Sequence, residues 1–549
     1  MYNSLTFHKS ESLDTGYYES SIPYNKDIYN LPSYKDEVKR YMKGYQKRLI
    51  NQPKTAKELD DIITKNISLG TLQWRKEILE ENPDFGNYKQ SYQPMNHVFK
   101  ESKSTPTRMV INCSFKTGSL PSFNDCQFKG PSLNRKLFDN LASIRTYKCF
   151  AVSDIDKFYN QVKINPKDSN LHTLLYKRHG ILCTCGCDFE DICNLSLSFG
   201  MKSAQCLANT AKIDASIKFI KPKCEQAHTL VKQSYTDDIF AGAKTTEKLK
   251  EHCAIITEGL RKASFTTKEW VFNSEFDDDD LRQNESINTL GLKWFSAKDY
   301  WSADPQINLS PKKRGMRSSS HQIDTAEDLE TYFSSNKLTK RQMLRAVHSL
   351  FDPLCLFVQA RSNLFLLYRN LLIENPKLDW EDPISEKIQN QLKKALKMVL
   401  EIKNLKLNRC GLPDDFSNGL TIGLFFDGSG DAANARIFLK AKTVSYFCGA
   451  TRLADLGPQS ATKTECRATL LALQLGQFLD DLFKENGIVI KEFFLFGDSG
   501  FANLVNFIES APRRRKLLHP DVKDPKFASK LAPPYDNIGK FHPHYECNN

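Results

Sequence analysis

Two adjacent acids, Asp237 and Asp238, lie between apolar and β-favouring residues in the segment QSYTDDIFAGA, residues 233–243. Neighbouring carboxylates repel each other and prefer water, so a solvated hairpin turn is one interpretation. The other is a pair of oxygen ligands for a divalent metal ion, which carboxylates of this kind supply. The four consecutive acids at 277–280 lie in a polar run without strand-forming neighbours, and we interpret them as a solvated loop.

A third acid, Asp154, stands where the apolar run of KCFAVSDIDKFYNQVKI, residues 148–164, comes to its end. Two Mg²⁺ ions about 4 Å apart need oxygen ligands from separate strands, and they bind substrate phosphates as well as protein. A carboxylate at the end of one strand and a pair in a neighbouring hairpin provide such ligands. Asp156 is the rival of Asp154 for this role.

A second set of acids lies near the end of the chain. Asp427 follows the apolar strand of GLTIGLFFDGSG, and Asp498 follows that of IKEFFLFGDSGF. Glu465 lies between them, at the start of a segment with helical periodicity. Thr462 and Glu465 also have the spacing of a capping box, which gives Glu465 a structural interpretation.

The elements that would position these acids alternate along the chain. From 96 to 300 we expect an antiparallel sheet backed by helices, with strands in 107–115, 148–164, 235–243 and 288–297 and helices in 201–220 and 244–265. A polar, Ser-rich break at about 302–336 precedes apolar helices from 339 to 373. From about 418 we expect strands in 419–430, 436–450 and 490–501 and one helix in 462–483.

Composition limits the class of protein. The 549 residues suggest about three or four domains, and 40% hydrophobic residues exclude a disordered chain. Lys and Arg outnumber Asp and Glu by 77 to 65, a net charge of +12, which suits a polyanionic partner without naming one. We find neither a signal peptide nor an apolar run long enough to span a membrane. The 15 scattered cysteines favour a reduced, intracellular setting.

Four of the cysteines are close in sequence. They occur in ILCTCGCDFEDIC, as Cys183, Cys185, Cys187 and Cys193. Structural zinc sites usually combine C-x2-4-C pairs, whereas the spacing here is C-x-C-x-C without a matching pair nearby. The sequence favours reduced thiols in a hairpin and leaves zinc binding open.

The order D-I-x-x-x-Y followed by Y-x-D-D, at 154–159 and 235–238, resembles the reverse transcriptases. The surrounding segments RMVINCS, SFNDCQFKGPSL, LSFGMKSAQCLAN, FTTKEWVFNS, TLGLKW and LTKRQMLRAVHSLFDPLCL resemble the BEL/Pao class of LTR retrotransposon polyproteins. This resemblance covers most of residues 17–510. It implies an α+β multidomain chain with a right-hand polymerase of fingers, palm and thumb, a helical connection and an α/β ribonuclease H-like domain.

The resemblance also implies boundaries. Residues 1–95 form an N-terminal helical extension of the fingers, and 96–300 hold the fingers and palm with the primer grip. Residues 301–415 form a mostly helical thumb and connection. Residues 416–510 form an incomplete ribonuclease H-like domain, and 511–549 form a basic, Pro-containing tail.

The resemblance implies a role for each matching residue. Asp154, Asp237 and Asp238 would hold two Mg²⁺ or Mn²⁺ ions that align a primer 3′-hydroxyl with the incoming nucleotide. Lys268 would protonate the pyrophosphate leaving group. Tyr159 would stack under the sugar and exclude a 2′-hydroxyl, which favours deoxynucleoside triphosphates.

Further residues implied by the resemblance bind the nucleotide and the primer. Arg108, whose planar fork suits phosphate oxygens, and Lys100 would contact the triphosphate. Phe199 and Gly200 would line the nucleotide pocket. The primer grip would consist of Leu290, Gly291 and Trp294. For all of these except the aspartates, a surface cation or a core residue is the competing interpretation.

Asp427, Glu465 and Asp498 match the order of metal-binding acids in ribonuclease H domains. The final forty residues lack the fourth acid of that family, so polymerisation is implied more strongly than RNA cleavage. Cys355 stands where the family usually has glycine. The partners implied are an RNA template, a DNA primer and the RNA–DNA hybrid, without a membrane. The expected location is the cytoplasm, the nucleus or both. In the cytoplasm the protein could lie within virus-like particles.

An alternative from another class is a domesticated or decayed relic that binds nucleic acid without catalysis. A viral RNA-dependent RNA polymerase also uses two metals and an acid pair. It would lack the second set of acids and would not place a tyrosine against the 2′-hydroxyl. The sequence leaves the oligomeric state open.

Overall fold

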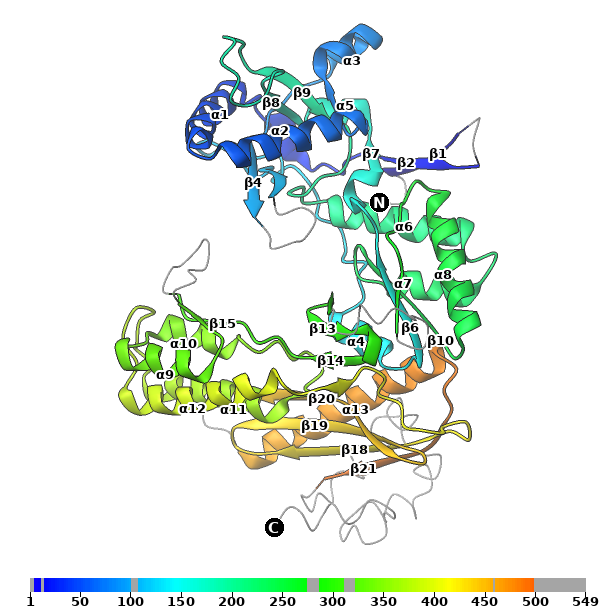
Figure 1. Ribbon diagram of the computed structural model, residues 1–549, viewed down its shortest axis with the longest axis vertical. Helices are drawn as coiled ribbons and strands as arrows, with labels where there is room; N and C mark the ends of the chain where they lie inside the picture. Colours follow the sequence, from blue (N-terminus) through cyan, green and yellow to red (C-terminus); the bar gives the residue numbers. More distant parts are fainter. Residues whose placement is uncertain are drawn as a thin grey trace. The chain divides into compact units, whose positions relative to one another are not determined.

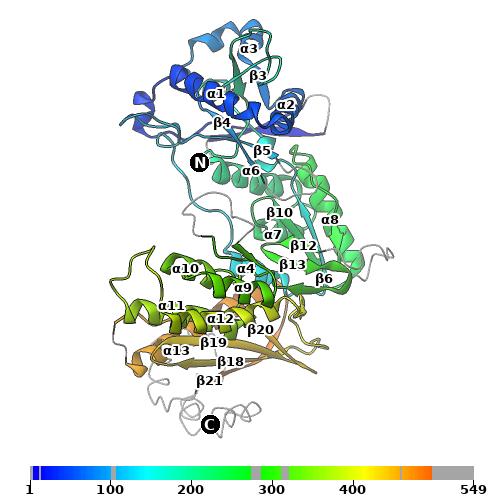
Figure 2. The same cartoon turned by 60° about the vertical axis from the view of Figure 1, so that its left-hand side comes forward.

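The computed structural model describes residues 4–10, 14–99, 107–273, 286–310, 321–457 and 460–497. The chain divides into two compact units. The first comprises Met1–Arg135, Ala151–Ala241 and Glu247–Val271, and the second comprises Lys136–Phe150, Gly242–Thr246 and Phe272–Asn549. Figures 1 and 2 show the elements of each unit in two views. None of the helices in these described ranges is both long and apolar enough to cross a membrane.

The first unit begins with a small sheet and two long helices. In the sheet, β2 (Gly16–Ser20) pairs with β1 (Leu5–Lys9) and, in parallel, with β7 (Val162–Ile164). The helices are α1 (Lys35–Ile50) and α2 (Pro53–Ser68). Val38, Tyr45 and Leu49 are buried on one face of α1, as their helical spacing predicts.

Further short elements complete this part of the unit. A three-stranded sheet has the order β3-β9-β8, and β4 pairs with β5 as an antiparallel hairpin. Their bounds, with those of two short helices, are β3 (Leu72–Trp74), α3 (Arg75–Glu81), β4 (Met95–Phe99), β5 (Thr107–Ile111), α5 (Pro166–Asn170), β8 (Thr173–Tyr176) and β9 (Glu190–Asn194).

A central sheet of order β10-β6-β11 carries the first set of acids. Its strands are β6 (Cys149–Asp154), β10 (Asp238–Ala243) and β11 (Val271–Phe272). Three helices lie between these strands in the sequence and beside them in Figure 1. They are α6 (Ala204–Phe219), α7 (Glu225–Gln233) and α8 (Thr246–Arg261). Only two of the four strands predicted for one sheet are in this central sheet, because the strand of 107–115 pairs in the β4-β5 hairpin and that of 288–297 lies in the sheet β12-β13-β14-β17.

The segment 148–164, predicted as one strand, is instead broken into three elements. β6 ends at Asp154, a single 3-10 turn covers Phe158–Gln161, and β7 begins at Val162 in a different sheet. Lys157 has φ +46°, a left-handed conformation that no strand can contain. The break matters because it places Asp154 at the end of the middle strand of its sheet and Tyr159 in the 3-10 turn that follows.

The second unit contains a sheet of order β12-β13-β14-β17 and a helical layer with its own core. Its elements before residue 410 are α4 (Leu137–Ile144), β12 (Ile287–Thr289), β13 (Leu292–Phe295), β14 (Tyr300–Ser302), β15 (Ile307–Asn308), β16 (Gln322–Ile323), α9 (Ala326–Ser335), α10 (Lys340–Val347), α11 (Val358–Glu374), α12 (Glu386–Ile402) and β17 (Leu407–Asn408). Leu364, Leu392 and Leu396 are among the fully buried residues that join these helices.

The rest of the second unit is a four-stranded sheet covered by one long helix. Its order is β20-β19-β18-β21, and β21 runs parallel to β18 while the other pairs are antiparallel. The elements are β18 (Leu420–Gly428), β19 (Ala432–Lys440), β20 (Val444–Leu453), α13 (Ala461–Glu485) and β21 (Ile490–Phe496). Helix α13 packs on β18 and β19, and α11 contacts β20.

Two predictions for this region are wrong in detail. Residues 436–450, predicted as one strand, form the end of β19 and the start of β20, because a tight turn at 441–443 joins them. The capping box at Thr462 is absent, because Ser460 is the N-cap of α13 and accepts a hydrogen bond from the Lys463 amide. Glu465 therefore has no capping role with Thr462.

Candidate active site

The acid pair lies in a tight turn. The backbone amides and carbonyls of Tyr235 and Asp238 bond to each other at 2.9 and 3.0 Å, which leaves Thr236 and Asp237 at the tip. Thr236 has φ +54°, a conformation that costs a β-branched residue free energy. The Asn134 side chain holds it in place, accepting from the Thr236 amide at 3.2 Å and donating to its hydroxyl at 2.7 Å.

A buried lysine, Lys212, also donates a hydrogen bond to this turn. Lys212 of α6 donates from Nζ to the Thr236 carbonyl at 2.7 Å, and its side chain is only 1% exposed. Burial lowers the pKa of Lys212 to about 8, against the opposing effect of the Asp237 and Asp238 charges. We did not single out Lys212 from sequence. The sequence does place Lys212 next to alanines at helical spacing, Ala208, Ala211 and Ala215. The structure buries all of them on one face of α6.

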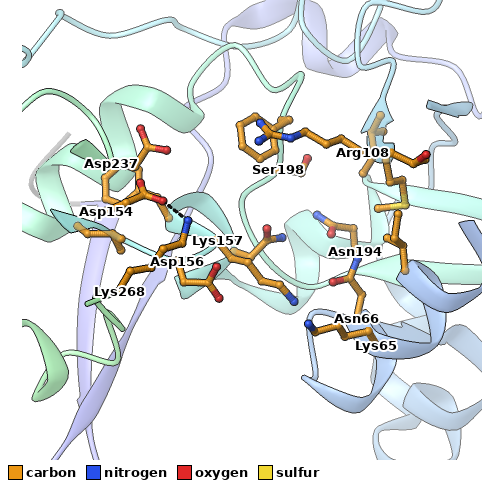
Figure 3. A pocket seen from close by; sticks show the side chains of 18 residues that line it. Lys65, Asn66, Arg108, Asp154, Asp156, Lys157, Asn194, Ser198, Asp237 and Lys268 are labelled. Atoms are coloured by element: carbon orange, nitrogen blue, oxygen red, sulfur yellow. Dashed lines mark hydrogen bonds and ion pairs between the residues drawn. The ribbon is translucent and has the colours of Figure 1, made fainter. Parts of the chain in front are cut away.

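Asp154 and Asp237 are brought together by backbone hydrogen bonds. The amide of Ile155 donates to the Asp237 carbonyl at 2.9 Å, and the amide of Lys268 donates to the Asp154 carbonyl at 2.8 Å. Both carboxylates line a pocket of about 260 Å³ in the first unit. In Figure 3 they lie on the same side of the view, and a dashed line joins the Lys268 ammonium to the Asp154 carboxylate.

The two carboxylates repel each other. Burial, and then the charge of Asp154, raise the pKa of Asp237 above its ordinary value. The Lys268 ammonium pairs with an Asp154 carboxylate oxygen, and this hydrogen bond raises the pKa of Lys268. Asp156 lines the same pocket, so the structure leaves it close to the site. Asp238 is exposed and is not among the residues that line the pocket.

Cations line the opposite side of the pocket. Arg108, an exposed residue of β5, lies there with Lys65 and Asn66 of α2. Lys157 also lines the pocket, and its pKa is lowered by partial burial and by the charge of Lys65. Positive charge gathered in this way suits a polyanionic ligand. Sequence reasoning found Arg108 but not Lys65 or Lys157, which no local pattern distinguishes from other surface lysines.

Tyr159 and Phe199 pack beside the acids. Their ring centroids are 4.9 Å apart and the planes are nearly perpendicular, at 83°. Burial and the Asp237 charge raise the pKa of the Tyr159 phenol, so the hydroxyl stays protonated. Phe199 lines the pocket and is 46% exposed.

Gly200 cannot be replaced without distortion. Its φ is +105°, and a Cβ there would lie 2.1 Å from the carbonyl oxygen of Ile111, at the end of β5. The missing side chain lets the segment that bears Phe199 approach the strand that bears Arg108. Lys100 lies outside the described residues.

The proposed primer grip belongs to the second unit. Leu290 and Gly291 form a two-residue turn between β12 and β13, with φ +49° and +91°, a geometry typical of β-hairpins. Trp294 is fully buried, and its indole nitrogen donates to Asp299 at 3.0 Å. Trp294 is therefore a core residue that supports this hairpin.

Two of the three acids of the second set, Asp427 and Glu465, lie in the described residues. Asp427 lies near the end of β18 and Glu465 in the first turns of α13. A Cβ on Gly428 would lie 2.4 Å from the Glu465 backbone nitrogen, so the strand and the helix meet at these acids. Asp498 lies outside the described residues.

The side chains of Asp154 and Asp237 are of a type that binds divalent metal. Carboxylate oxygens are the ligands that Mg²⁺ and Mn²⁺ prefer. Burial, and after it the charge of Asp154, raise the pKa of Asp237. A divalent cation between Asp154 and Asp237 would remove that repulsion.

Comparison with known proteins matches both halves of the chain. The model of the reverse transcriptase (RNA-dependent DNA polymerase) family matches residues 92–272, and that of the Pao retrotransposon-like RNaseH-like domain matches 339–499. No curated protein matches. Among solved structures, that of a foamy viral protease-reverse transcriptase dRH in complex with ds DNA has a TM-score of 0.50 at 12% identity and covers 86% of this chain and 69% of its own. A second, in complex with RNA/DNA hybrid, has a TM-score of 0.46 at 12% identity and covers 86% and 53%.

Fold and order of domains define a reverse transcriptase followed by a ribonuclease H-like domain, an α+β right-hand polymerase fold. The second family match gives the particular class. The two family matches, in this order along the chain, support a Pao-type retrotransposon reverse transcriptase with a ribonuclease H-like domain.

Proposed function

We propose that this RNA-directed DNA polymerase extends a DNA primer on an RNA template by two-metal nucleotidyl transfer from deoxynucleoside triphosphates. The observation that carries the proposal is the meeting of Asp154 and Asp237 in one pocket, opposite Arg108. Negative charge on one side and positive charge on the other suit metal ions and a triphosphate respectively.

Asp154 and Asp237 would hold Mg²⁺ or Mn²⁺ ions, with Asp238 as a further ligand. Such metals neutralise phosphate charge and make the primer 3′-hydroxyl a better nucleophile. Arg108 binds phosphate oxygens through its planar fork and orients the triphosphate. The Tyr159 ring, fixed edge-on by Phe199, excludes a 2′-hydroxyl.

Lys268 is proposed to act on the leaving group. Its ammonium pairs with Asp154, and the raised pKa keeps it protonated at neutral pH. Asp154 would hold the metal in the loaded enzyme, and the Lys268 ammonium would then be available to the pyrophosphate. It can then donate a hydrogen bond and a proton as negative charge develops there.

A nucleic-acid partner is supported by charge and by fold. The net charge is +12. The foamy viral structure with the same fold was solved in complex with ds DNA. RNA cleavage is left out of the proposal, because only Asp427 and Glu465 of the second acid set lie in the described residues.

The test is primer extension on poly(rA)/oligo(dT) with Mg²⁺ or Mn²⁺. We expect incorporation of dTMP from dTTP and much less of UMP from UTP. The variant Asp237→Asn/Asp238→Asn should lose at least about 100-fold in rate, since charge stabilisation of the transition state disappears. Glu251→Gln, which changes a surface acid of α8 paired with Lys248, is the matched control.

Folded wild-type protein that binds the primer–template without extending it would favour the catalytically inactive relic. Equal use of UTP would favour an RNA polymerase instead. An equal loss of rate in the Glu251→Gln control would remove the special role of the acid pair.

A further inference from the structure

Three cysteines in the first unit gather outside the polymerase pocket. Cys183, Cys185 and Cys187 lie in the loop between β8 and β9. Their sulfur atoms all lie within 4.8 Å of one another, and those of Cys183 and Cys187 are 3.6 Å apart. Cys193, the fourth of the sequence cluster, is fully buried on β9 beside the Thr173 hydroxyl and does not join them.

The loop backbone is folded to make this cluster. Gly186 has φ +79°, which turns the chain between Cys185 and Cys187. The amide of Cys185 donates to the Cys183 sulfur at 3.3 Å. An amide that donates to sulfur favours the thiolate, the form that binds metal.

The spacing of the sulfurs fits a tetrahedral ion. Zinc–sulfur bonds of about 2.3 Å place neighbouring sulfurs of a tetrahedral site about 3.8 Å apart. The observed separations require only small side-chain rotations to reach that value.

The surroundings provide charge and anchorage. Three thiolates around a divalent ion leave one negative charge, and the Lys177 ammonium lies close by, donating to the Cys183 carbonyl at 3.2 Å. On either side of the cluster the loop is tied to α1. Gln46 donates to the Ile181 carbonyl at 2.8 Å, and Lys39 pairs with Asp188.

We propose that Cys183, Cys185 and Cys187 bind one zinc ion, with a fourth ligand from outside these three residues. The site is structural: it fixes the β8–β9 loop against α1. Thiolates select a soft or borderline cation such as Zn²⁺, whereas the carboxylate sites select Mg²⁺. The two kinds of site are therefore separable by their metals.

The test uses the full chain, stripped of metal and kept reduced, with Co²⁺ as a spectroscopic probe and Zn²⁺ as competitor. We expect a thiolate-to-cobalt charge-transfer band that saturates at one equivalent and disappears on addition of Zn²⁺. Carboxylate-bound Co²⁺ gives no such band. Zn²⁺ should also raise the unfolding temperature of the stripped protein.

Cys183→Ser/Cys185→Ser/Cys187→Ser should lose the band and the zinc-dependent shift. The matched control is Cys224→Ser/Cys410→Ser/Cys466→Ser, which removes the other three cysteines that are not fully buried in the described residues. This control should keep both signals. Cys185→Ser alone, a change at an exposed residue, should weaken the band in a protein that folds normally.

Absence of the band in wild-type protein with fully reduced thiols would overturn the proposal. So would a band that survives in Cys183→Ser/Cys185→Ser/Cys187→Ser, or one lost equally in the control. Polymerase activity is measured with Mg²⁺ alone and does not enter this test, so the two proposals stand or fall separately.

Discussion

Asp237 stands in a position that the metal-free fold disfavours. It follows Thr236, whose left-handed backbone is strained, and burial and the charge of Asp154 raise its pKa. Strain and repulsion of this kind are common at functional sites, where the surrounding structure enforces them. Their presence here supports a role for this carboxylate in holding a cation.

Asp237→Asn should stabilise the metal-free protein while it abolishes polymerisation. The pKa of Asp237 is raised in the folded state, so above that pKa its ionised form costs more in the fold than in the unfolded chain. Urea unfolding in EDTA should show a higher free energy of unfolding for the variant at pH 7 to 8. The difference should shrink as pH falls toward the ordinary carboxyl pKa of 3.8, below which both states are protonated.

Saturating Mg²⁺ should reduce the difference in free energy of unfolding between Asp237→Asn and wild type at pH 7. The metal binds only the wild-type carboxylate pair and therefore stabilises only the wild-type protein. A variant less stable than wild type in EDTA at neutral pH would contradict the repulsion that we infer. A stability difference independent of pH would contradict it as well.

Among single residues, the sequence predicted that Asp154 and Asp237 lie close together, which the shared pocket confirms, but it did not predict the side chains that position them. Asp154 ends an apolar run and Asp237 belongs to an acid pair between β-favouring residues, and both patterns are visible in the sequence. Lys212 and Asn134 act through contacts with the Thr236 backbone that only the folded chain brings about. Lys100 and Asp498 lie outside the described residues and stay predictions.

Among the elements, the turn at 235–238 depends on α6. Lys212 extends from that helix to the Thr236 carbonyl, and its Nζ lies 5.4 Å from the centroid of the Phe158 ring. The helix thus links the acid turn to the 3-10 turn that carries Tyr159. A positioning role for Lys212 follows from these contacts.

Lys212→Met should slow polymerisation through the turn. It keeps most of the apolar stem and removes the donor, which leaves a carbonyl without its partner at a cost of about 1–3 kcal/mol. We expect kcat to fall, with a higher Mg²⁺ requirement, while KM for the primer–template stays unchanged. Lys218→Met, on the exposed side of the same helix, is the control and should retain kcat.

A merely structural role for Lys212 would lower the unfolding temperature and leave kcat and the Mg²⁺ dependence of the surviving folded protein as in wild type. That result would remove Lys212 from the account of the active site.

Long, strongly patterned elements were predictable, whereas interruptions were not. The helices 201–220 and 244–265 correspond to α6 and α8. At 155–161 the chain leaves the sheet of β6 for that of β7, and at 441–443 a tight turn lets β19 pair with β20. The cap of α13 moved to Ser460 because that residue, not Thr462, precedes the first helical turn.

For the molecule as a whole, each set of acids lies within one compact unit. The polymerase pocket belongs entirely to the first unit, and the sheet that bears Asp427 belongs to the second. The two family matches follow the same order along the chain. The order of motifs in the sequence was therefore sufficient to predict the class of protein and its fold.

The central claim concerns metal between Asp154 and Asp237. The most direct measurement is anomalous scattering from Mn²⁺ in crystals of the protein with an RNA template, a DNA primer and a non-hydrolysable deoxynucleotide. We predict manganese peaks coordinated by both carboxylates, beside the triphosphate. Carboxylates that point apart in that complex, with no manganese bound to either, would contradict the account.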